Sequence, residues 1–257
     1  MATVADILNF LETLAPKSMK MDWDNVGLLC GSKRGEVTKI LVALDPFEGV
    51  CHEAAVIGAQ LIVTHHPLIF QAPTAITDET SIGRSIMFLC ANGISAINAH
   101  TNLDVAPGGV NDVLAARLGL ENVEIVNPQN GIGLMRCGEI TEQTLETFLA
   151  TVKENLGCEG LRYVDGGKPV RKVAVGGGSC AGGMMEVLAA GCDTFVTADI
   201  KYNQFWDARD LGLNLIDAGH FHTENPVVSV LAEKITAAFP EVEVKISKTH
   251  ADCMKYY

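Results

Sequence analysis

The sequence predicts an α/β protein that contains the same kind of α/β unit twice. Short runs rich in Val, Ile and Leu alternate with helical stretches, which is the pattern of βαβ units and a mostly parallel sheet. The alternation occurs once in each half of the 257-residue chain. Histidine and carboxylate side chains follow several of the predicted strands, so we also expect a metal site beyond the ends of those strands.

The first half of the chain contains three predicted strands separated by helices. A helix over 4–14 precedes this unit and a helix over 110–118 follows it. Gly93, just after the second internal helix, is typical of a helix C-cap. The elements of the unit are, in order, strand 39–44, helix 49–58, strand 60–64, helix 81–92 and strand 94–98.

The second half repeats this order of elements. The segment between the halves contains a break near 127–131, a turn at 165–167 and an amphipathic helix over 141–155, because its apolar residues fall on one face. The elements of the second unit are strand 172–175, helix 183–190, strand 193–197, helix 202–210 and strand 213–216.

A constant offset of 133 positions aligns the two halves, and this favours an internal duplication. The alternative is that two generic βαβ units resemble each other by chance. We place the first domain at residues 1–125 plus 215–257 and the second at residues 126–214. The identical pairs are Lys39 and Lys172, Val42 and Val175, Gly49 and Gly182, Glu53 and Glu186, Gly58 and Gly191, Val63 and Val196, and Thr64 and Thr197.

The composition indicates a folded protein with a sizeable apolar core. Hydrophobic residues make up 48% and charged residues 19% of the chain, and neither value indicates disorder. The net charge is −12 without any cluster of Lys or Arg. This argues against nucleic acid or an anionic membrane as the main partner. A small anionic substrate is compatible with this charge because a bound metal ion reverses the local field.

Other features of the sequence favour a cytoplasmic protein. No apolar run approaches the roughly 18 residues that a membrane-spanning helix needs. Residues 1–10 lack the basic region and apolar stretch of a signal peptide. The eight cysteines occur singly, without a C-x-x-C pair. We therefore expect mostly reduced core thiols, and neither a zinc knuckle nor a thioredoxin-type motif.

The first candidate metal ligands are His65 and His66, which directly follow the strand 60–64. In open α/β sheets, ligands bind beyond the carboxyl ends of the strands. Two adjacent imidazoles point in diverging directions, which suits two metal ions better than one. The alternative is a pair of loop histidines without a role.

Two further segments bring a histidine and a carboxylate to strand ends. His100 and Asp104 follow the strand 94–98, although Asp104 by itself is also typical of a turn or a helix cap. His220 and Glu224 follow the last strand, and their spacing of four places them on one face if a helical turn begins there. Such a pair can chelate one ion, and Glu224 could also bridge two.

The distribution and the type of these side chains favour a transition metal. Five of the seven histidines lie in the three segments; one of them, His222, points away from the others and is expected to support the site or lie at the surface. Imidazole and carboxylate without thiolate favour Zn²⁺, Fe²⁺, Mn²⁺, Ni²⁺ or Co²⁺ over Ca²⁺ or Cu⁺. Two such ions lower the pKa of a shared water, so hydrolysis is the natural reaction type.

Two other motifs have competing interpretations. Residues 176–181 fit a loose G-x-G-x-x-A pattern, with Asp199 near the place of a ribose-binding acid. A tight turn or a backbone lining of the active cleft is favoured over a dinucleotide site there. The cluster around Trp23 is either a turn that anchors this residue in the core or a segment that brings Asp24 or Asn25 to the cleft.

Together, four motifs resemble the Ngg-interacting-factor-three-like (Nif-three-like) family, whose members are also described as GTP cyclohydrolase I type 2 homologues. The motifs run through most of the chain in the family's order. Ala198, where the family commonly has Gly, and the tail 250–257 depart from its pattern. The matching motifs are Trp23-Asp24-Asn25-x-Gly27, Thr64-His65-His66-Pro67, His100-Thr-Asn-Leu-Asp104 and Gly219-His220-x-x-x-Glu224.

The resemblance implies two similar three-layer α/β/α domains with a dinuclear metal site in the cleft between them. It also implies a ring-shaped homohexamer and two divalent metal ions per chain. Glu224, and Asp104 as a second candidate, would touch both ions. The ligands implied position by position are His65, His66, Asp104, His220 and Glu224.

The function favoured by these features is metal-dependent hydrolysis of a small molecule, which the resemblance specifies as opening of the imidazole ring of GTP with release of formate. His100 or Glu224 would carry the proton. Candidate cations for the phosphates are Lys33, Arg34, Arg84 and Lys201. The alternatives are a metallohydrolase of phosphoesters or other C–N bonds, and a non-catalytic metal-binding ring that regulates or docks partner proteins. A nicotinamide-dependent oxidoreductase rests on the 176–181 loop alone.

Overall fold

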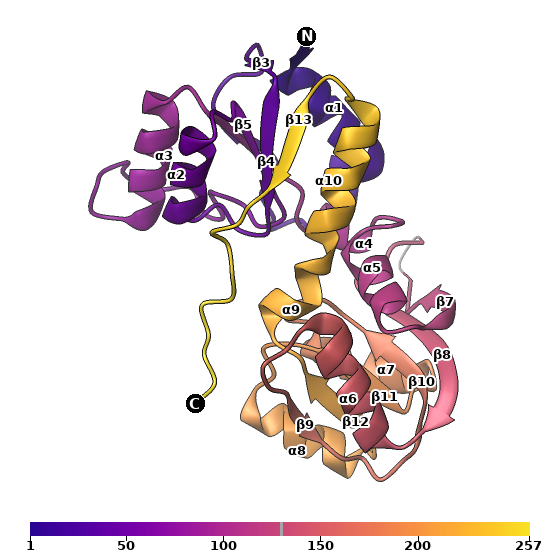
Figure 1. Cartoon of the computed structure of the whole chain (residues 1–257). Coiled ribbons are helices and arrows are strands. Elements are labelled where there is room, and N and C mark those ends of the chain that lie inside the picture. The colour runs from indigo at the N-terminus through magenta and orange to yellow at the C-terminus, as the bar shows by residue number, and fades with distance from the viewer. Residues whose placement is uncertain (129–130) are drawn as a thin grey trace. The chain divides into compact units, whose positions relative to one another are not determined.

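The computed structural model describes residues 1–128 and 131–257, which divide into two compact units. Unit 1 comprises Met1–Ala106 and Val228–Ala251, and unit 2 comprises Pro107–Val227 and Asp252–Tyr257 (Figure 1). Both units mix helices with a central sheet, so the predicted α/β class is confirmed. Part of the predicted break near 127–131 lies outside the described residues.

Unit 1 contains a five-stranded sheet and a small two-stranded ribbon. Its strands are β1 (Ala2–Thr3), β2 (Gly27–Cys30), β3 (Glu36–Val37), β4 (Lys39–Ala43), β5 (Leu61–Thr64), β6 (Ser95–Asn98) and β13 (Glu243–Ile246). The order in the sheet is β13–β4–β5–β6–β2, while β1 and β3 form the ribbon. All neighbours in the sheet are parallel except β2, which runs antiparallel to β6.

Helices cover both faces of this sheet. They are α1 (Val4–Leu14), the 3₁₀ turn η1 (Lys17–Met19), α2 (Glu48–Val56), α3 (Ser81–Ala91), α4 (Thr101–Val105) and α10 (Pro226–Ala238). In Figure 1, α2 and α3 lie on one side of the sheet, and α1 and α10 lie on the other. Leu41 and Ile62 pack with Leu89 of α3 in one apolar cluster. Phe10 contacts Phe239 edge to face, with ring centroids 5.5 Å apart, between α1 and the end of α10.

Unit 2 is built on a six-stranded sheet. Its strands are β7 (Glu121–Ile125), β8 (Arg136–Gln143), β9 (Arg162–Val164), β10 (Val170–Val175), β11 (Thr194–Thr197) and β12 (Asn214–Asp217), in the order β7–β8–β10–β11–β12–β9. The central strands β10, β11 and β12 are parallel. β8 and β9 flank them in antiparallel orientation, and β7 runs antiparallel to β8.

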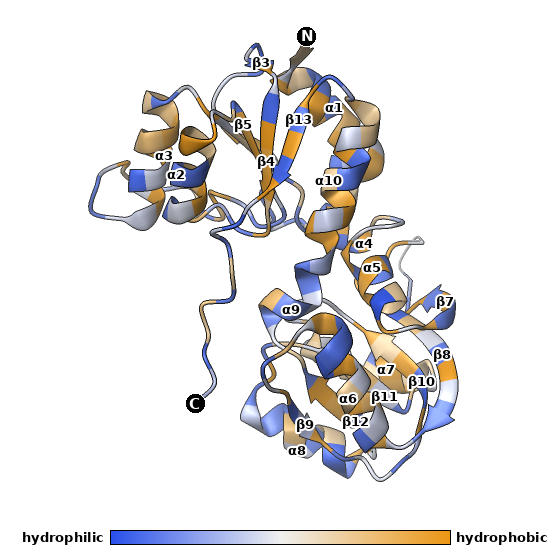
Figure 2. Ribbon diagram, viewed as in Figure 1, coloured by the Kyte–Doolittle hydropathy of each residue, from blue (hydrophilic) through white to orange (hydrophobic). Residues whose placement is uncertain are grey.

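Two apolar clusters sandwich the sheet of unit 2 and make it a three-layer structure. The helices are α5 (Val110–Arg117), α6 (Leu145–Leu156), the 3₁₀ turn η2 (Ala181–Gly183), α7 (Met184–Ala189), α8 (Tyr202–Asp210) and α9 (His220–Glu224). Val196 packs with residues of α5 and α6, whereas its neighbour Phe195 packs with residues of α7 and α8. This alternation follows from the opposite orientation of successive side chains along a strand. The central strands are accordingly mostly hydrophobic in Figure 2.

The sheets of the two units repeat the same core topology and register. In each sheet, three parallel strands follow one another in sequence, and an earlier strand, β2 in unit 1 and β9 in unit 2, pairs antiparallel with the third. Ile40 pairs with Leu61 in unit 1, and Val173 pairs with Thr194 in unit 2, which is the same register at the offset of 133. The sheets differ at the other edge, where β13 is parallel and β8 antiparallel.

Side-chain hydrogen bonds repeat at the same offset. Lys39 Nζ donates to the carbonyl of Ile57, and Lys172 Nζ donates to the carbonyl of Ala190. The side chain of Gln60 accepts hydrogen bonds from the backbone N–H groups of 38 and 39, and that of Asp193 does so from 171 and 172. Generic βαβ units share a topology but do not share such details, so these bonds favour internal duplication over chance resemblance.

The boundaries between the units differ from the predicted ones, which lay between residues 125 and 126 and between residues 214 and 215. β7 pairs with β8, and α5 packs in an apolar cluster of the second sheet, so residues from Pro107 onward belong to unit 2. β12 pairs with β11, which keeps residues up to Val227 in the same unit. The chain returns to unit 1 through α10 and β13, two elements that were not predicted, within the segment 215–257 that the sequence analysis placed in the first domain.

The helix predicted over 141–155 begins later, at Leu145. Residues up to Gln143 extend β8 instead, and Thr144 caps the helix by accepting a hydrogen bond from the N–H of Thr147 at 3.2 Å. The capping side chain therefore sets the start of the helix. No helix among the described residues is long and apolar enough to cross a membrane. The eight cysteines are free thiols, and five of them are buried.

The carboxylate of Glu53, on α2, holds the segment that follows β13. It accepts hydrogen bonds from Ser247 Oγ at 2.5 Å, from the N–H of Lys248 at 2.9 Å and from Thr249 Oγ1 at 2.7 Å. Partial burial raises the pKa of Glu53, but these hydrogen bonds outweigh burial and lower it below its ordinary value. The charged form of Glu53 therefore stabilises unit 1.

Replacing this carboxylate is expected to reduce stability in a pH-dependent way. Glu53→Gln should lower the free energy of unfolding by roughly 1 kcal/mol at neutral pH. Because the folded-state pKa is lowered, the stabilisation is present above the ordinary pKa of Glu and is lost as the pH falls through the lowered value. Urea unfolding should show the difference between wild type and variant shrinking in acid. The exposed Glu79→Gln is the control, and an equal effect of both variants would contradict the assignment.

Candidate metal centre

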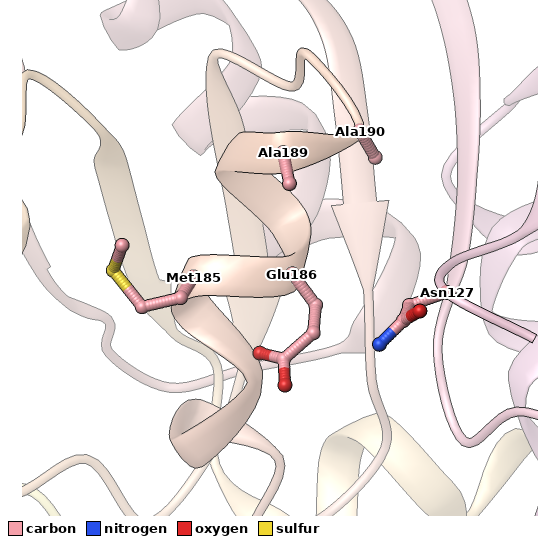
Figure 3. Close-up of a pocket in the computed structure, with 5 residues that line it drawn as sticks. All are labelled: Asn127, Met185, Glu186, Ala189 and Ala190. Atoms are coloured by element: carbon pink, nitrogen blue, oxygen red, sulfur yellow. The ribbon is translucent and has the colours of Figure 1, made fainter.

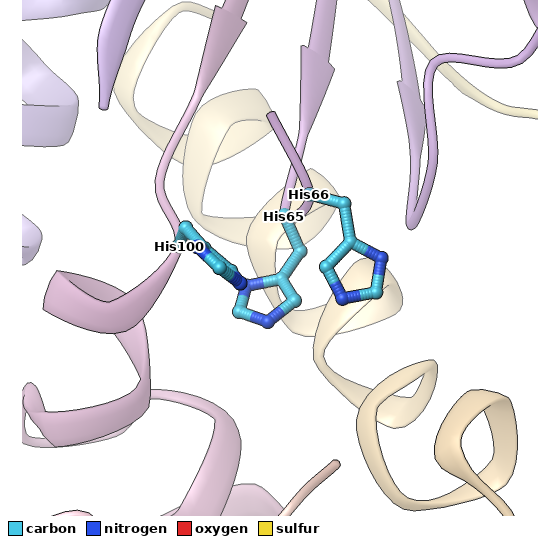
Figure 4. A group of neighbouring side chains, drawn as sticks. All are labelled: His65, His66 and His100. Carbon is cyan, nitrogen blue, oxygen red and sulfur yellow. The ribbon is translucent and has the colours of Figure 1, made fainter. Parts of the chain in front are cut away.

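The carboxyl ends of the three parallel strands in unit 1 carry the polar side chains of the first cluster. Asp45 comes shortly after β4, His65 and His66 follow β5, and His100 follows β6. Because neighbouring parallel strands end at one edge of the sheet, these residues meet there. The histidine ring centroids lie 4.9 to 5.5 Å apart. Figure 4 shows the three imidazoles gathered beyond the strand ends.

Hydrogen bonds at Nδ1 fix the orientation of all three rings. His65 Nδ1 lies 2.9 Å from the carbonyl oxygen of Ala99. His66 Nδ1 lies 2.7 Å from Asp45 Oδ1, and His100 Nδ1 lies 2.8 Å from Asp24 Oδ1. An oxygen acceptor at Nδ1 places the proton there and leaves the Nε2 lone pair for a ligand, as is typical of metal-binding histidines. Ring nitrogens of the three histidines lie within 4.8 Å of one another.

Asp104 brings a carboxylate to the same cluster. It lies on α4, which begins just after His100, and its Oδ1 is 3.5 Å from His65 Nε2. Both residues are buried. Because His65 carries its proton on Nδ1, a lone pair and a carboxylate oxygen face each other here. A metal ion between the two groups makes this arrangement favourable.

Two carboxylates, the buried Asp24 and the half-buried Asp45, hold the histidine rings in place. Asp24 accepts hydrogen bonds from His100 and from the backbone and hydroxyl of Thr101. Burial raises the pKa of Asp24, but these bonds outweigh it and hold the pKa far below its usual range. The same balance, with His250 and His66 as the partners, lowers the pKa of Asp45. Both carboxylates are therefore ionised and keep the rings in place.

Unit 2 carries a second histidine–carboxylate pair. Gly219, with a φ of +83°, turns the chain from β12 into α9. On this helix, His220 Nε2 lies 3.0 Å from Glu224 Oε2, and His220 Nδ1 lies 2.7 Å from Asp199 Oδ2. Burial lowers the pKa of His220, but hydrogen bonds and charges of Glu224 and Asp199 raise it to about 9. A cation, either a proton or a metal ion, thus suits the place between His220 and Glu224.

A similar pair of side chains follows the third parallel strand in each unit. In each unit a histidine follows the third parallel strand, and a carboxylate lies four residues later on a helix of one turn. The pairs are His100 with Asp104 and His220 with Glu224. The two units therefore bring a histidine and a carboxylate to corresponding ends of their sheets, although not at matching positions: His100 precedes α4, whereas His220 is the first residue of α9.

The glycine-rich segment after β10 packs against the pair in unit 2. A Cβ on Gly178 would lie 2.3 Å from Glu224 Oε1 and 3.0 Å from His220 Nε2, and its φ is +61°. The N–H of Gly178 also donates to Thr223 Oγ1 at 3.0 Å. The close approach of Glu224 and His220 leaves no room for a side chain at position 178, which explains the glycine. Asp199, the residue considered for ribose binding, binds His220 instead. The segment 176–181 is therefore a turn that lines the site, which is the interpretation favoured over a dinucleotide site.

Other residues singled out in the sequence have structural roles. His222 is held by the carbonyl of Leu156 and by Asp252, at 3.2 and 3.3 Å. Arg84 forms an ion pair with Glu48 at 2.6 Å. Trp23 is 62% exposed, so the alternative that it anchors a turn in the core is wrong.

Three supporting residues were not recognised from the sequence in these roles. Asp45 lies just beyond a parallel strand, like the histidines, so its position was a usable signal. Asp199 was noted only as a candidate for binding ribose, but it orients His220. His250 donates to Asp45 across 205 positions, with Nε2 2.8 Å from Oδ2. No local pattern indicates that contact.

A separate cavity of about 450 Å³ lies against α7 in unit 2 (Figure 3). Its described lining contains a single carboxylate and no histidine, and therefore offers no set of metal ligands. The lining residues are Asn127, Met185, Glu186, Ala189 and Ala190.

The fold and these clusters define an α/β protein with a repeated unit and histidine–carboxylate groups that could hold metal ions. Residues 2–253 match the family Duf34/NIF3 (NGG1p interacting factor 3). The chain is 39% identical to a Clostridium perfringens protein named GTP cyclohydrolase 1 type 2 homolog, over 98% of both chains. It therefore belongs to the Duf34/NIF3 family, and the resemblance noted in the sequence is confirmed.

Solved structures agree with this assignment. A crystal structure of a Staphylococcus aureus protein matches with a TM-score of 0.92 and 30% identity, covering 100% of this chain and 99% of that one. A Bacillus cereus protein described as related to NIF3 matches with a TM-score of 0.94 and 26% identity, with the same coverage. The fold is thus shared over the whole length of these proteins.

A side chain at position 178 is expected to disturb the pair in unit 2. Gly178→Ala should lower the free energy of unfolding by about 1–3 kcal/mol, because it forces a left-handed backbone on alanine and drives Cβ into Glu224. Chemical denaturation measures the loss. Gly182→Ala, in the same loop region with open space around its Cβ, is the matched control. Equal stability of the two variants would contradict the described packing.

Proposed function

We propose that this chain binds two divalent transition-metal ions and acts as a metal-dependent hydrolase. The observation that carries the proposal is the pairing of an Nδ1-anchored histidine with a carboxylate in both units. His65 Nε2 faces Asp104 at 3.5 Å, and His220 Nε2 faces Glu224 at 3.0 Å. Neutral imidazole and carboxylate are ligands of Zn²⁺, Fe²⁺, Mn²⁺, Ni²⁺ and Co²⁺.

We assign the metal ligands to both units. A catalytic ion of this kind usually takes about three protein ligands and keeps a position open for water or substrate. The family resemblance implies that the pair in unit 2 contributes to a dinuclear centre. The resemblance of the motifs to those of the family supports the same ligand set. It consists of His65, His66, Asp104, His220 and Glu224.

The proposed reaction divides the work between the ions and the side chains. Bound metal ions would supply an acidic water and polarise the substrate. His100 stands outside the ligand set, and Asp24 fixes its Nδ1, so its Nε2 is oriented to take up and return a proton. Glu224 is the second candidate for this task, because it is buried and its carboxylate lies within hydrogen-bonding distance of the imidazole of His220.

The substrate we infer is a small molecule with a hydrolysable C–N bond, with GTP as the first candidate. Relatives with 39% and 34% identity carry the name GTP cyclohydrolase 1 type 2 homolog. Opening of the imidazole ring would consume water, break C–N bonds and release the ring carbon as formate. The acidic chain has few cations for a triphosphate, since Arg84 is paired with Glu48, and metal ions would offset this charge.

Two alternatives make different predictions. A phosphoester metallohydrolase would use the same ions to release phosphate. A non-catalytic ring that regulates or docks partner proteins would bind metal without turning over either substrate. We extend to this chain the homohexamer expected for the family, which sedimentation of the purified protein tests.

Metal content is the first test of the proposal. Protein purified without chelators or affinity metals should contain about two equivalents of transition metal per chain by elemental mass spectrometry. The double variant His65→Ala/Glu224→Ala should lose them, because each cluster loses a ligand. The control is His52→Ala/Glu79→Ala, which alters residues outside both clusters. Absence of metal from wild type even after reconstitution would rule out the metal-dependent hydrolase.

Turnover then separates the functions. Metal-loaded protein should release formate from GTP, and the double variant should not. Release of phosphate from a phosphoester without formate would favour the phosphoesterase. Full metal content without turnover of either substrate would favour the non-catalytic ring.

Variants of two supporting carboxylates test whether His66 is a metal ligand and His100 a proton carrier. Asp45→Asn should weaken metal binding by about 10- to 100-fold, because Asp45 orients the proposed ligand His66. Asp24→Asn should leave metal content unchanged and lower turnover by roughly 10-fold or more, because it releases His100. Metal titration and steady-state kinetics measure the two effects, and circular dichroism checks the fold. Loss of metal in Asp24→Asn would instead make His100 a ligand.

A further inference from the structure

Two aromatic side chains next to His100 are largely open to solvent. Trp23 is 62% exposed and Phe70 is 46% exposed. Their ring centroids are 5.8 Å apart, and they lie 6.2 and 6.1 Å from that of His100. The three rings thus form a triangle, in which one corner belongs to the candidate metal centre and the other two are apolar and exposed.

The position of these rings is fixed by the surrounding backbone. Asn25 Nδ2 donates to the carbonyl of Ile69 at 2.7 Å, which ties the segment of Trp23 to that of Phe70. Asn98 Nδ2, at the end of β6, donates to the carbonyl of Asn25 at 3.1 Å. Asp24, the neighbour of Trp23, binds both His100 and Thr101. The aromatic pair is therefore anchored to the same strand end as the histidine.

Exposure of both rings at this place is not explained by packing. Large apolar side chains normally bury most of their surface, and clustered exposed ones mark binding sites. Phe70 and Trp23 contact His100 edge to face but leave much of their own faces uncovered. Ligand sites combine apolar and aromatic walls with a few oriented polar groups, which is the combination found here.

We propose that Trp23 and Phe70 form the face on which a planar heteroaromatic ring of purine size lies while it is presented to His100. This inference rests on the proposed function and adds the residues that position the substrate. Stacking on an aromatic face is independent of charge, so it gives an acidic protein a means of holding the ring of an anionic nucleotide. A second copy of the chain covering the two rings is the competing occupant.

Tryptophan fluorescence reports directly on this contact. The chain has two tryptophans, so Trp206→Phe leaves Trp23 as the only one. GTP and guanosine should quench Trp23 emission in a saturable way, because the purine ring covers the indole. Inorganic tripolyphosphate, which has no ring, should not. The measurement is made on the full-length protein both with metal and after its removal, so that failure of metal binding does not hide ring binding.

Binding of GTP measured by equilibrium dialysis provides the second readout. Trp23→Ala should weaken binding roughly 5- to 150-fold, Phe70→Ala should weaken it less, and Trp23→Phe should restore most of the affinity. Trp206→Ala is the matched control, since Trp206 is 49% exposed but lies on α8 of unit 2. Metal content should stay at the wild-type level in every variant, which separates loss of ring binding from loss of the metal centre.

Two outcomes would overturn the proposal. One is the absence of saturable quenching by both purine compounds, or equal binding of tripolyphosphate and GTP with no effect of Trp23→Ala. The other is a change of oligomeric mass in Trp23→Ala, measured by sedimentation, with GTP binding unchanged. That result would assign the aromatic pair to a contact between copies of the chain.

Discussion

The hydrogen bond at histidine Nδ1 is the interaction on which the candidate centre depends. Each histidine in the two clusters has an oxygen acceptor at this atom, supplied by Asp24, Asp45, Asp199 or the carbonyl of Ala99. The acceptor fixes the tautomer and the ring, so Nε2 is offered in a defined direction. Without this hydrogen bond, each imidazole would populate several rotamers and would lose conformational entropy on binding a ligand.

The clusters concentrate negative charge, and this constrains what they can hold. Asp104 and Glu224 are buried and approach the Nε2 atoms of His65 and His220. A buried carboxylate beside a lone pair is stable only when a cation compensates it. In metal-free protein a proton can serve, as the raised pKa of His220 indicates. A divalent metal ion supplies more charge at the same place, which is why we favour a metal centre.

The duplicated scaffold explains how similar ligands arise at distant points of the chain. Each unit repeats three parallel strands, the register between them and the lysine that binds a helix C-terminus. The units diverge at the strand ends, where His66 in unit 1 corresponds to Asp199 in unit 2 at the same offset. In both units this position takes part in a histidine–carboxylate hydrogen bond, with the two roles exchanged.

The sequence by itself determined the α/β class, the repeated unit and the strand ends at which His65, His66, His100 and His220 stand, because hydrophobic alternation and local spacing are properties of neighbouring residues. The edge strands, and the pairing of β13 with β4 among them, depend on contacts between distant segments. The same holds for the contact of His250 with Asp45, across 205 positions. The exposure of Trp23, against the core position considered for it, was decided only by the packing of its surroundings. Tertiary structure decided these features because they arise from contacts that no local pattern encodes.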